Sequence, residues 1–106
     1  MTVSTEQLDA LRLQYGQVWV ASPNENPDTE VVYRKASRIE ARAYYTDRDS
    51  DAYKYLAAER LVSACVVYPP RHDLEALLDA NAFFAGPLAG AIMMASGGGD
   101  ARSKKA

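Results

Sequence analysis

The stretch QVWVASPNENPDTEVVYR, residues 17–34, decides the fold class of this 106-residue chain. Its two ends, 17–21 and 30–34, are rich in the β-branched and aromatic residues that favour strands. Between them, 22–28 combines prolines, asparagines and an aspartate, which is a concentrated turn signal. The pattern therefore predicts an antiparallel β-hairpin with a loop longer than the tight two-residue kind. An isolated hairpin is marginally stable in water, so we expect this one to lie against helices.

A short amphipathic helix precedes the hairpin. Ser4 and Gln7 have the spacing of a capping box, in which the two residues exchange hydrogen bonds at the start of a helix. Leu8 and Leu11 follow at helical spacing, and Gly16 is a natural C-terminal stop.

A second capping box follows the hairpin. Ser37 and Glu40 have the same spacing, so a helix is expected from there to about Tyr45. The polar stretch 46–50 then predicts an interruption. A longer helix is expected to start near Asp51.

The longer helix carries its apolar residues on one stripe and ends before two prolines. Prolines at positions 69 and 70 cannot continue it. Asp73 is expected to cap another short helix, and Pro87 suits the first turn of a last helix that stops at Gly97. The stripe of the longer helix consists of Tyr55, Ala58, Leu61, Val62 and Cys65.

These elements predict an α+β fold: a short N-terminal helix, an antiparallel β-hairpin, then a bundle of three to four helices. We expect one domain over 1–96 and a flexible, Gly-rich, basic tail over 97–106. No signal peptide is visible at the N-terminus, and the longest uncharged apolar stretch, 82–95, is shorter than the ~18 residues of a membrane span. A single cysteine suits a reducing compartment, so we expect a cytoplasmic protein. The net charge of −2 is too near neutral to indicate nucleic acid or an acidic membrane as the main partner.

Asp47, Asp49 and Asp51 resemble the start of an EF-hand calcium loop. The match then fails, because Ala52 replaces the sharp-turn glycine and Ala58 occupies the position of the bidentate glutamate. A solvated linker with a helix cap is favoured, and no metal site is predicted.

Cys65 and His72 are the chain's single cysteine and histidine. Catalysis by Cys65 would need a nearby base and a raised thiolate fraction. Its place on an apolar helix stripe predicts a buried, inert thiol instead. His72 is expected at the start of the helix after the prolines. The sequence therefore indicates neither an enzyme nor a cofactor site.

A basic aromatic patch is the candidate for nucleic-acid binding. It would consist of Arg34, Lys35, Arg38 and Arg42 with neighbouring tyrosines. Because Glu40 and the following aspartates dilute the positive field, a solvated helix face is the favoured interpretation. No nucleic acid or membrane is expected among the partners.

The apolar segment 83–94 is the most informative for function. Its large side chains lie on more than one face of any helix, and a domain this small has little else to cover them. We expect one face to join the core and another to bind a partner, and aspartates at Ile92 and Met93 to abolish binding without unfolding the domain. The candidate partner-binding residues are Phe83, Phe84, Leu88, Ile92, Met93 and Met94.

Over residues 8–96 the chain resembles the small tail assembly chaperones of long-tailed bacteriophages. The likeness is an ordered set of elements and aromatic anchors rather than an invariant chemical signature. The matching features are Tyr15-Gly16 at the end of the first helix, Val32-Tyr33-Arg34-Lys35, Ser37-Arg38-Ile39-Glu40, Val66-Val67-Tyr68-Pro69, Leu74-Glu75-Ala76-Leu77-Leu78 and Gly86-Pro87-Leu88.

The resemblance implies a protein made in the cytoplasm of the infected bacterium. Such chaperones bind the aggregation-prone tape measure protein, keep it soluble while tail tube subunits polymerise around it, and are absent from the mature virion. Many also exist as a longer form made by ribosomal frameshifting. Homo-oligomers are possible.

Two other functions stay open. One is a structural virion component, such as a head–tail connector or minor capsid or tail protein, which would form a stable oligomer within particles. The other is a small nucleic-acid-binding regulator, whose binding to DNA would depend steeply on salt.

Overall fold

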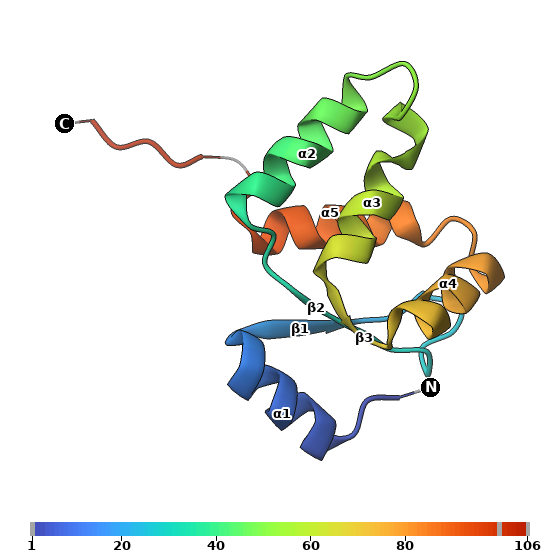
Figure 1. The fold of residues 1–106 in the computed structure, drawn as a ribbon. Coiled ribbons are helices and arrows are strands. Elements are labelled where there is room, and N and C mark those ends of the chain that lie inside the picture. The colour runs from blue at the N-terminus through green and yellow to red at the C-terminus, as the bar shows by residue number, and fades with distance from the viewer. Residues whose placement is uncertain (1, 100, 106) are drawn as a thin grey trace.

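The computed structural model describes residues 2–99 and 101–105, and it has the α+β fold that the sequence predicts (Figure 1). A helix and a hairpin precede a bundle of further helices. The elements are α1 (Thr5–Tyr15), β1 (Val18–Ala21), β2 (Val31–Arg34), α2 (Arg38–Arg48), the 3-10 helix η1 (Lys54–Leu56), α3 (Ala57–Cys65), β3 (Val66–Tyr68), α4 (Arg71–Ala80) and α5 (Ala85–Ala95).

Both predicted capping boxes form. In α1 the backbone N–H of Gln7 donates to Ser4 Oγ at 3.1 Å, and the N–H of Ser4 donates to Gln7 Oε1 at 2.9 Å. Ser37 and Glu40 make the same exchange at the start of α2, at 3.1 and 2.8 Å. Gly16 ends α1 with a φ of +79°, which only glycine adopts without strain.

The predicted hairpin is confirmed, and it belongs to a three-stranded antiparallel sheet in the order β1-β2-β3. Trp19 pairs with Tyr33 across the hairpin, and their rings stack with centroids 5.8 Å apart. Such aromatic cross-strand pairs stabilise a sheet beyond the area that they bury.

Strand β3 was not predicted, since residues 66–68 were expected to end the preceding helix. The helix stops at Cys65, and Val66 takes an extended conformation with φ −73° and ψ 125°. Val66 and Val67 are β-branched, and the residue before Pro69 is sterically pushed out of the helical region. The free edge of β2 then offers pairing partners, with Val32 opposite Tyr68.

Strand β2 is buried on both faces of the sheet. Val31 and Tyr33 belong to the core cluster shared with α3, α4 and α5. Val32 is also 0% exposed, and because side chains alternate along a strand it points to the opposite face. That face carries α1, while α3 and α5 lie on the other side of the sheet (Figure 1).

The boundary between α2 and α3 lies further along the chain than predicted. Helix α2 continues to Arg48, through the polar residues that were expected to interrupt it. Asp47 in its last turn pairs with Arg60 of α3, with 3.2 Å between Oδ1 and Nη1. A turn and η1 follow, so Tyr55 lies outside α3 and is 83% exposed rather than on the apolar stripe.

The last two helices begin and end close to the predicted positions. Helix α4 starts at Arg71 after Pro70, so Asp73 lies in its first turn and does not cap it. Pro87 lies in the first turn of α5, as predicted. Gly98 donates its N–H to Met93 O at 2.7 Å and closes the helix end. Residues 101–105 are exposed and have no regular structure, while Asp100 and Ala106 of the predicted tail lie outside the described residues.

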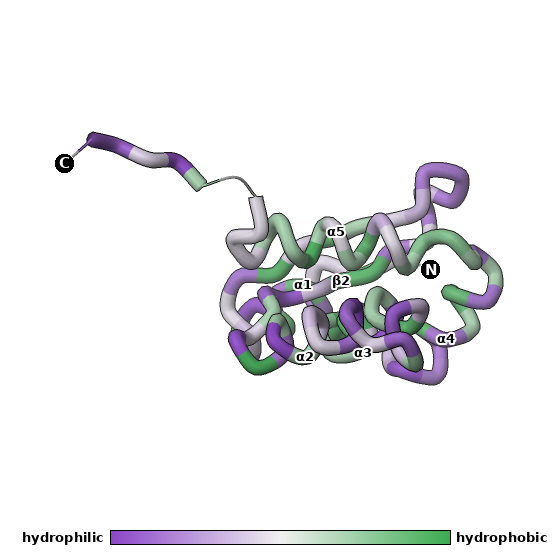
Figure 2. The backbone as a smooth tube through the Cα atoms, turned by 90° about the horizontal axis from the view of Figure 1, so that it is seen from above, coloured by the Kyte–Doolittle hydropathy of each residue, from purple (hydrophilic) through white to green (hydrophobic). Residues whose placement is uncertain are grey.

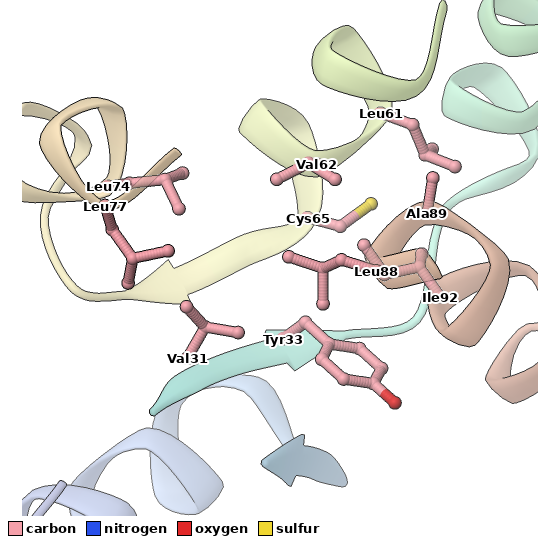
Figure 3. Packing of buried hydrophobic residues seen from close by; sticks show 10 residues of the cluster. All are labelled: Val31, Tyr33, Leu61, Val62, Cys65, Leu74, Leu77, Leu88, Ala89 and Ile92. Carbon is pink, nitrogen blue, oxygen red and sulfur yellow. The ribbon is translucent and has the colours of Figure 1, made fainter. Parts of the chain in front are cut away.

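The core lies between the sheet and α3, α4 and α5 (Figure 3). Leu74 and Leu77 of α4 lie above Val31, and Leu88 and Ile92 of α5 lie beside Tyr33. The core cluster consists of Val31, Tyr33, Leu61, Val62, Cys65, Leu74, Leu77, Leu88, Ala89 and Ile92.

Two truncations in α5 test this arrangement. Ile92 is 0% exposed and Met94 is 65% exposed. Ile92→Ala should lower the free energy of unfolding by about 2–5 kcal/mol because it leaves a cavity in the core. Met94→Ala should change it by less than about 0.5 kcal/mol. Urea denaturation followed by circular dichroism measures both, and equal small losses would contradict the burial of Ile92.

Candidate functional site

Two of the six candidate partner-binding residues are buried where no partner can reach them. Leu88 and Ile92 are 1% and 0% exposed, so the prediction that they contact a partner is wrong for the folded chain. The sheet and α3 supply enough apolar surface to cover this face of α5. For the same reason, an aspartate at Ile92 should unfold the domain rather than only abolish binding.

The other four residues face outward or lie at the border of the core. Phe84 and Met93 are partly buried and pack against the core. Phe83 is 93% exposed and Met94 is 65% exposed. They stand at opposite ends of α5, which is about 16 Å long. The six candidates therefore do not form one patch, and Phe83 is the most exposed of them.

Phe83 lines a groove between the hairpin loop and the turn from α4 to α5. The groove has a volume of about 520 Å³. Phe84 and Pro87 also line it, and the hairpin loop forms its opposite wall. We call this groove the Phe83 surface; its lining consists of residues 22–26, 80–84 and Pro87.

Two asparagines join the walls of the Phe83 surface. Asn26 Nδ2 in the hairpin loop donates to Asn81 Oδ1 at 2.7 Å, and Asn81 Nδ2 donates to Leu77 O at 2.9 Å. The loop is therefore held against the end of α4. The composition of 22–28 predicts only a turn, because nothing in it indicates which distant residue its side chains meet.

A cluster of polar groups lies where β2, α2 and α3 meet. Arg34 donates from both terminal nitrogens to the two carboxylate oxygens of Glu40, each at 2.8 Å. Its Nη2 also donates to Ala64 O at 2.8 Å. The Cys65 thiol donates to Glu40 Oε1 at 3.9 Å. Arg34 therefore connects all three elements.

The pKa values in this cluster follow from its geometry. Hydrogen bonds from Arg34 lower the pKa of the Glu40 carboxyl from 4.5 to about 2. Burial, followed by the nearby Glu40 carboxylate, raises the pKa of Cys65 to about 11. A thiol that stays protonated at neutral pH is a poor nucleophile. The predicted buried thiol is thus found at 0% exposure, and its hydrogen-bond partner is Glu40 rather than His72.

His72 and the aspartates of the calcium-loop-like stretch lie at helix ends or in ion pairs. His72 lies exposed in the first turn of α4. Asp47 pairs with Arg60 at 3.2 Å, and Asp51 lies 3.7 Å from Lys54 Nζ. Within the described residues no three His, Cys, Asp or Glu side chains are grouped so that they could hold a metal ion. None of the described helices has the length and apolar character to span a membrane.

The fold has a structural relative. The chain is similar to an uncharacterised protein, rbstp2171 from Bacillus stearothermophilus, with a TM-score of 0.76 and 18% identity. The likeness covers 92% of this chain and 99% of the other, and at this identity it shows the shared fold alone. No family model and no curated protein matches the chain.

The Arg34–Glu40 pair makes a testable contribution to stability. Glu40→Gln keeps the capping box, as Gln7 does in α1, but removes the charge that holds Arg34. We expect a loss of about 1–3 kcal/mol at pH 7, because Arg34 loses its carboxylate partner.

The same variant tests the lowered pKa of Glu40. Because that pKa is lower in the folded chain than in the unfolded one, the pair stabilises fully above pH 4.5 and loses its effect as the pH falls toward about 2. Urea titrations at several pH values should show the wild type and Glu40→Gln converging in acid. A constant difference would contradict the assignment.

Proposed function

We propose that this protein is a tail assembly chaperone of a long-tailed bacteriophage, which binds the tape measure protein and keeps it soluble during tail tube assembly. The observation that carries the proposal is the Phe83 surface, where a phenylalanine that is 93% exposed lies beside a groove of about 520 Å³. A single exposed apolar residue is ordinary, but one at a preformed groove is typical of a binding site.

The chemistry of this surface suits an apolar segment of a long helical partner. Phe83, Phe84 and Pro87 supply apolar contact, and the asparagines of the hairpin loop supply hydrogen-bonding groups at its border. Burying an exposed phenylalanine is worth about 1.5–3 kcal/mol, which favours binding that can be reversed when tube subunits arrive.

The rest of the proposal follows from the resemblance. The protein acts in the cytoplasm of the infected bacterium and leaves before the virion is complete. Tail tube subunits, and a longer frameshifted form of the kind that many such chaperones have, are its candidate further partners. It needs no catalytic group, metal or cofactor for this work.

Co-expression with the tape measure protein of the same phage tests the proposal. The wild-type chain should keep the tape measure protein in the soluble fraction and co-elute with it in size-exclusion chromatography. Phe83→Asp should weaken the complex by about tenfold or more. Leu13→Asp is the matched control, since Leu13 is 91% exposed on α1, away from the groove, and should leave binding unchanged.

Three results would overturn the proposal. The tape measure protein could stay insoluble beside the folded wild-type chain, or both aspartate variants could bind equally well. The chain could also be found in purified virions, which would favour a structural virion component. Circular dichroism should first confirm that the wild-type chain and both aspartate variants are folded.

A further inference from the structure

The outward face of α2 carries cations without carboxylate partners. Arg38 and Arg42 are exposed and lie one turn apart, and their side chains make no hydrogen bond or ion pair with any described residue. Lys35 precedes them, and Ile39 lies beside them with 77% exposure. We call these four residues the basic stripe.

The acidic residues of α2 point the other way. Glu40 is paired with Arg34, and Asp47 is paired with Arg60 on α3. Their side chains are 22% and 14% exposed. Glu40 thus neutralises Arg34, one of the four cations of the predicted patch, as expected, and Asp47 is neutralised by Arg60, so Lys35, Arg38 and Arg42 remain as the exposed cations of this face.

A second surface has the opposite charge. A groove of about 260 Å³ between α3 and α4 is lined by Glu59, Ser63, Glu75, Leu78 and Asp79. Neither Glu59 nor Asp79 pairs with any described residue. We call it the acidic groove.

Two cations border the acidic groove, and each already has a carboxylate. Arg71 lies 3.8 Å from Glu75, and Arg60 pairs with Asp47. Both line the adjoining hollow beside Glu59. The carboxylates of the groove therefore outnumber the cations that reach them.

The two surfaces lie on different sides of the molecule. Helix α3 lies between α2 and α4 in Figure 2. The inward residues of α2 face α3, so the basic stripe points away from it, whereas the acidic groove opens on the α4 side. One chain therefore cannot bring its own stripe into its own groove.

We propose that the basic stripe of one molecule docks in the acidic groove of a second copy, head to tail. Arg38 and Arg42 meet the carboxylates of Glu59, Glu75 and Asp79, and Ile39 contacts Leu78. Charge complementarity between two surfaces of the same chain carries this proposal, which does not depend on the tape measure protein. Because the contact is heterologous, it leaves one stripe and one groove free at the ends and can extend into a row or close into a ring.

A second copy fits the stripe better than nucleic acid does. Phosphates offer nothing to Ile39, whose exposed side chain stands among the cations. The acidic groove supplies both the opposite charge and an apolar residue, Leu78, for Ile39 to contact. Nucleic acid is therefore treated as an alternative outcome of the experiment.

Sedimentation velocity of the purified chain at several protein concentrations tests the proposal. Association should be strong at about 0.01 M salt and weak at about 1 M, where the Debye length falls from about 30 to about 3 Å. Arg38→Glu/Arg42→Glu and Glu75→Arg/Asp79→Arg should each lower the association constant by about tenfold or more, because each makes the contact repulsive.

A mixture of the two double variants provides the sharpest result. We expect neither variant to associate alone. In Arg38→Glu/Arg42→Glu both surfaces are acidic, and in Glu75→Arg/Asp79→Arg both are basic. Mixing the two should therefore restore association. The control Arg12→Glu/Lys54→Glu changes the charge equally at exposed cations outside the stripe and should associate like the wild type.

Four outcomes would overturn the proposal. The wild-type chain could stay monomeric at low salt, the double variants could associate like the wild type, or their mixture could stay monomeric. In the fourth outcome, the monomer binds DNA in a salt-dependent way and Arg38→Glu/Arg42→Glu abolishes that binding. Loss of tape measure binding alone would leave this proposal standing, since the Phe83 surface is a separate site.

Discussion

The burial of β2 on both faces of the sheet is the constraint on which the rest of the structure depends. Val31 and Val32 point to opposite faces and are both fully buried, so helices must lie on both sides. Val31 and Tyr33 pack in one cluster with residues of α3, α4 and α5, while α1 lies on the other face of the sheet. Arg34, at the end of the same strand, reaches Glu40 and Ala64 and so places α2 beside α3.

This arrangement determines which apolar residues remain available for binding. Helix α5 is apolar over most of its surface, but Leu88 and Ile92 are used to cover the sheet and α3. The exposed apolar side chains are left at the ends, with Phe83 at the groove beside the hairpin loop. Exposed and buried apolar side chains are therefore separated along the helix as well as around it. The orientation of α2 likewise separates its paired carboxylates from its free guanidinium groups.

Local signals predicted the elements whose hydrogen bonds are made within a few residues. The Ser4–Gln7 and Ser37–Glu40 capping boxes and the Gly16 stop are short-range, so their spacing was sufficient. Strand β3 was missed because three residues of strand depend on β2 for their pairing. The end of α2 was placed too early, and Asp47 in its last turn pairs with Arg60, thirteen residues away, a contact that local sequence does not reveal. The groove was missed because Asn26 meets Asn81 only in the folded chain.

By itself the sequence determined the α+β class, the hairpin and the helix caps, because periodicity and short-range hydrogen bonds specify them. Only the tertiary structure decided which face of each amphipathic or apolar helix is buried. Burial depends on the area that other elements supply, and that area comes from residues far apart in the chain. Hence the sequence predicts partner contact for both Phe83 and Ile92, whereas in the folded chain Phe83 is exposed and Ile92 lies in the core.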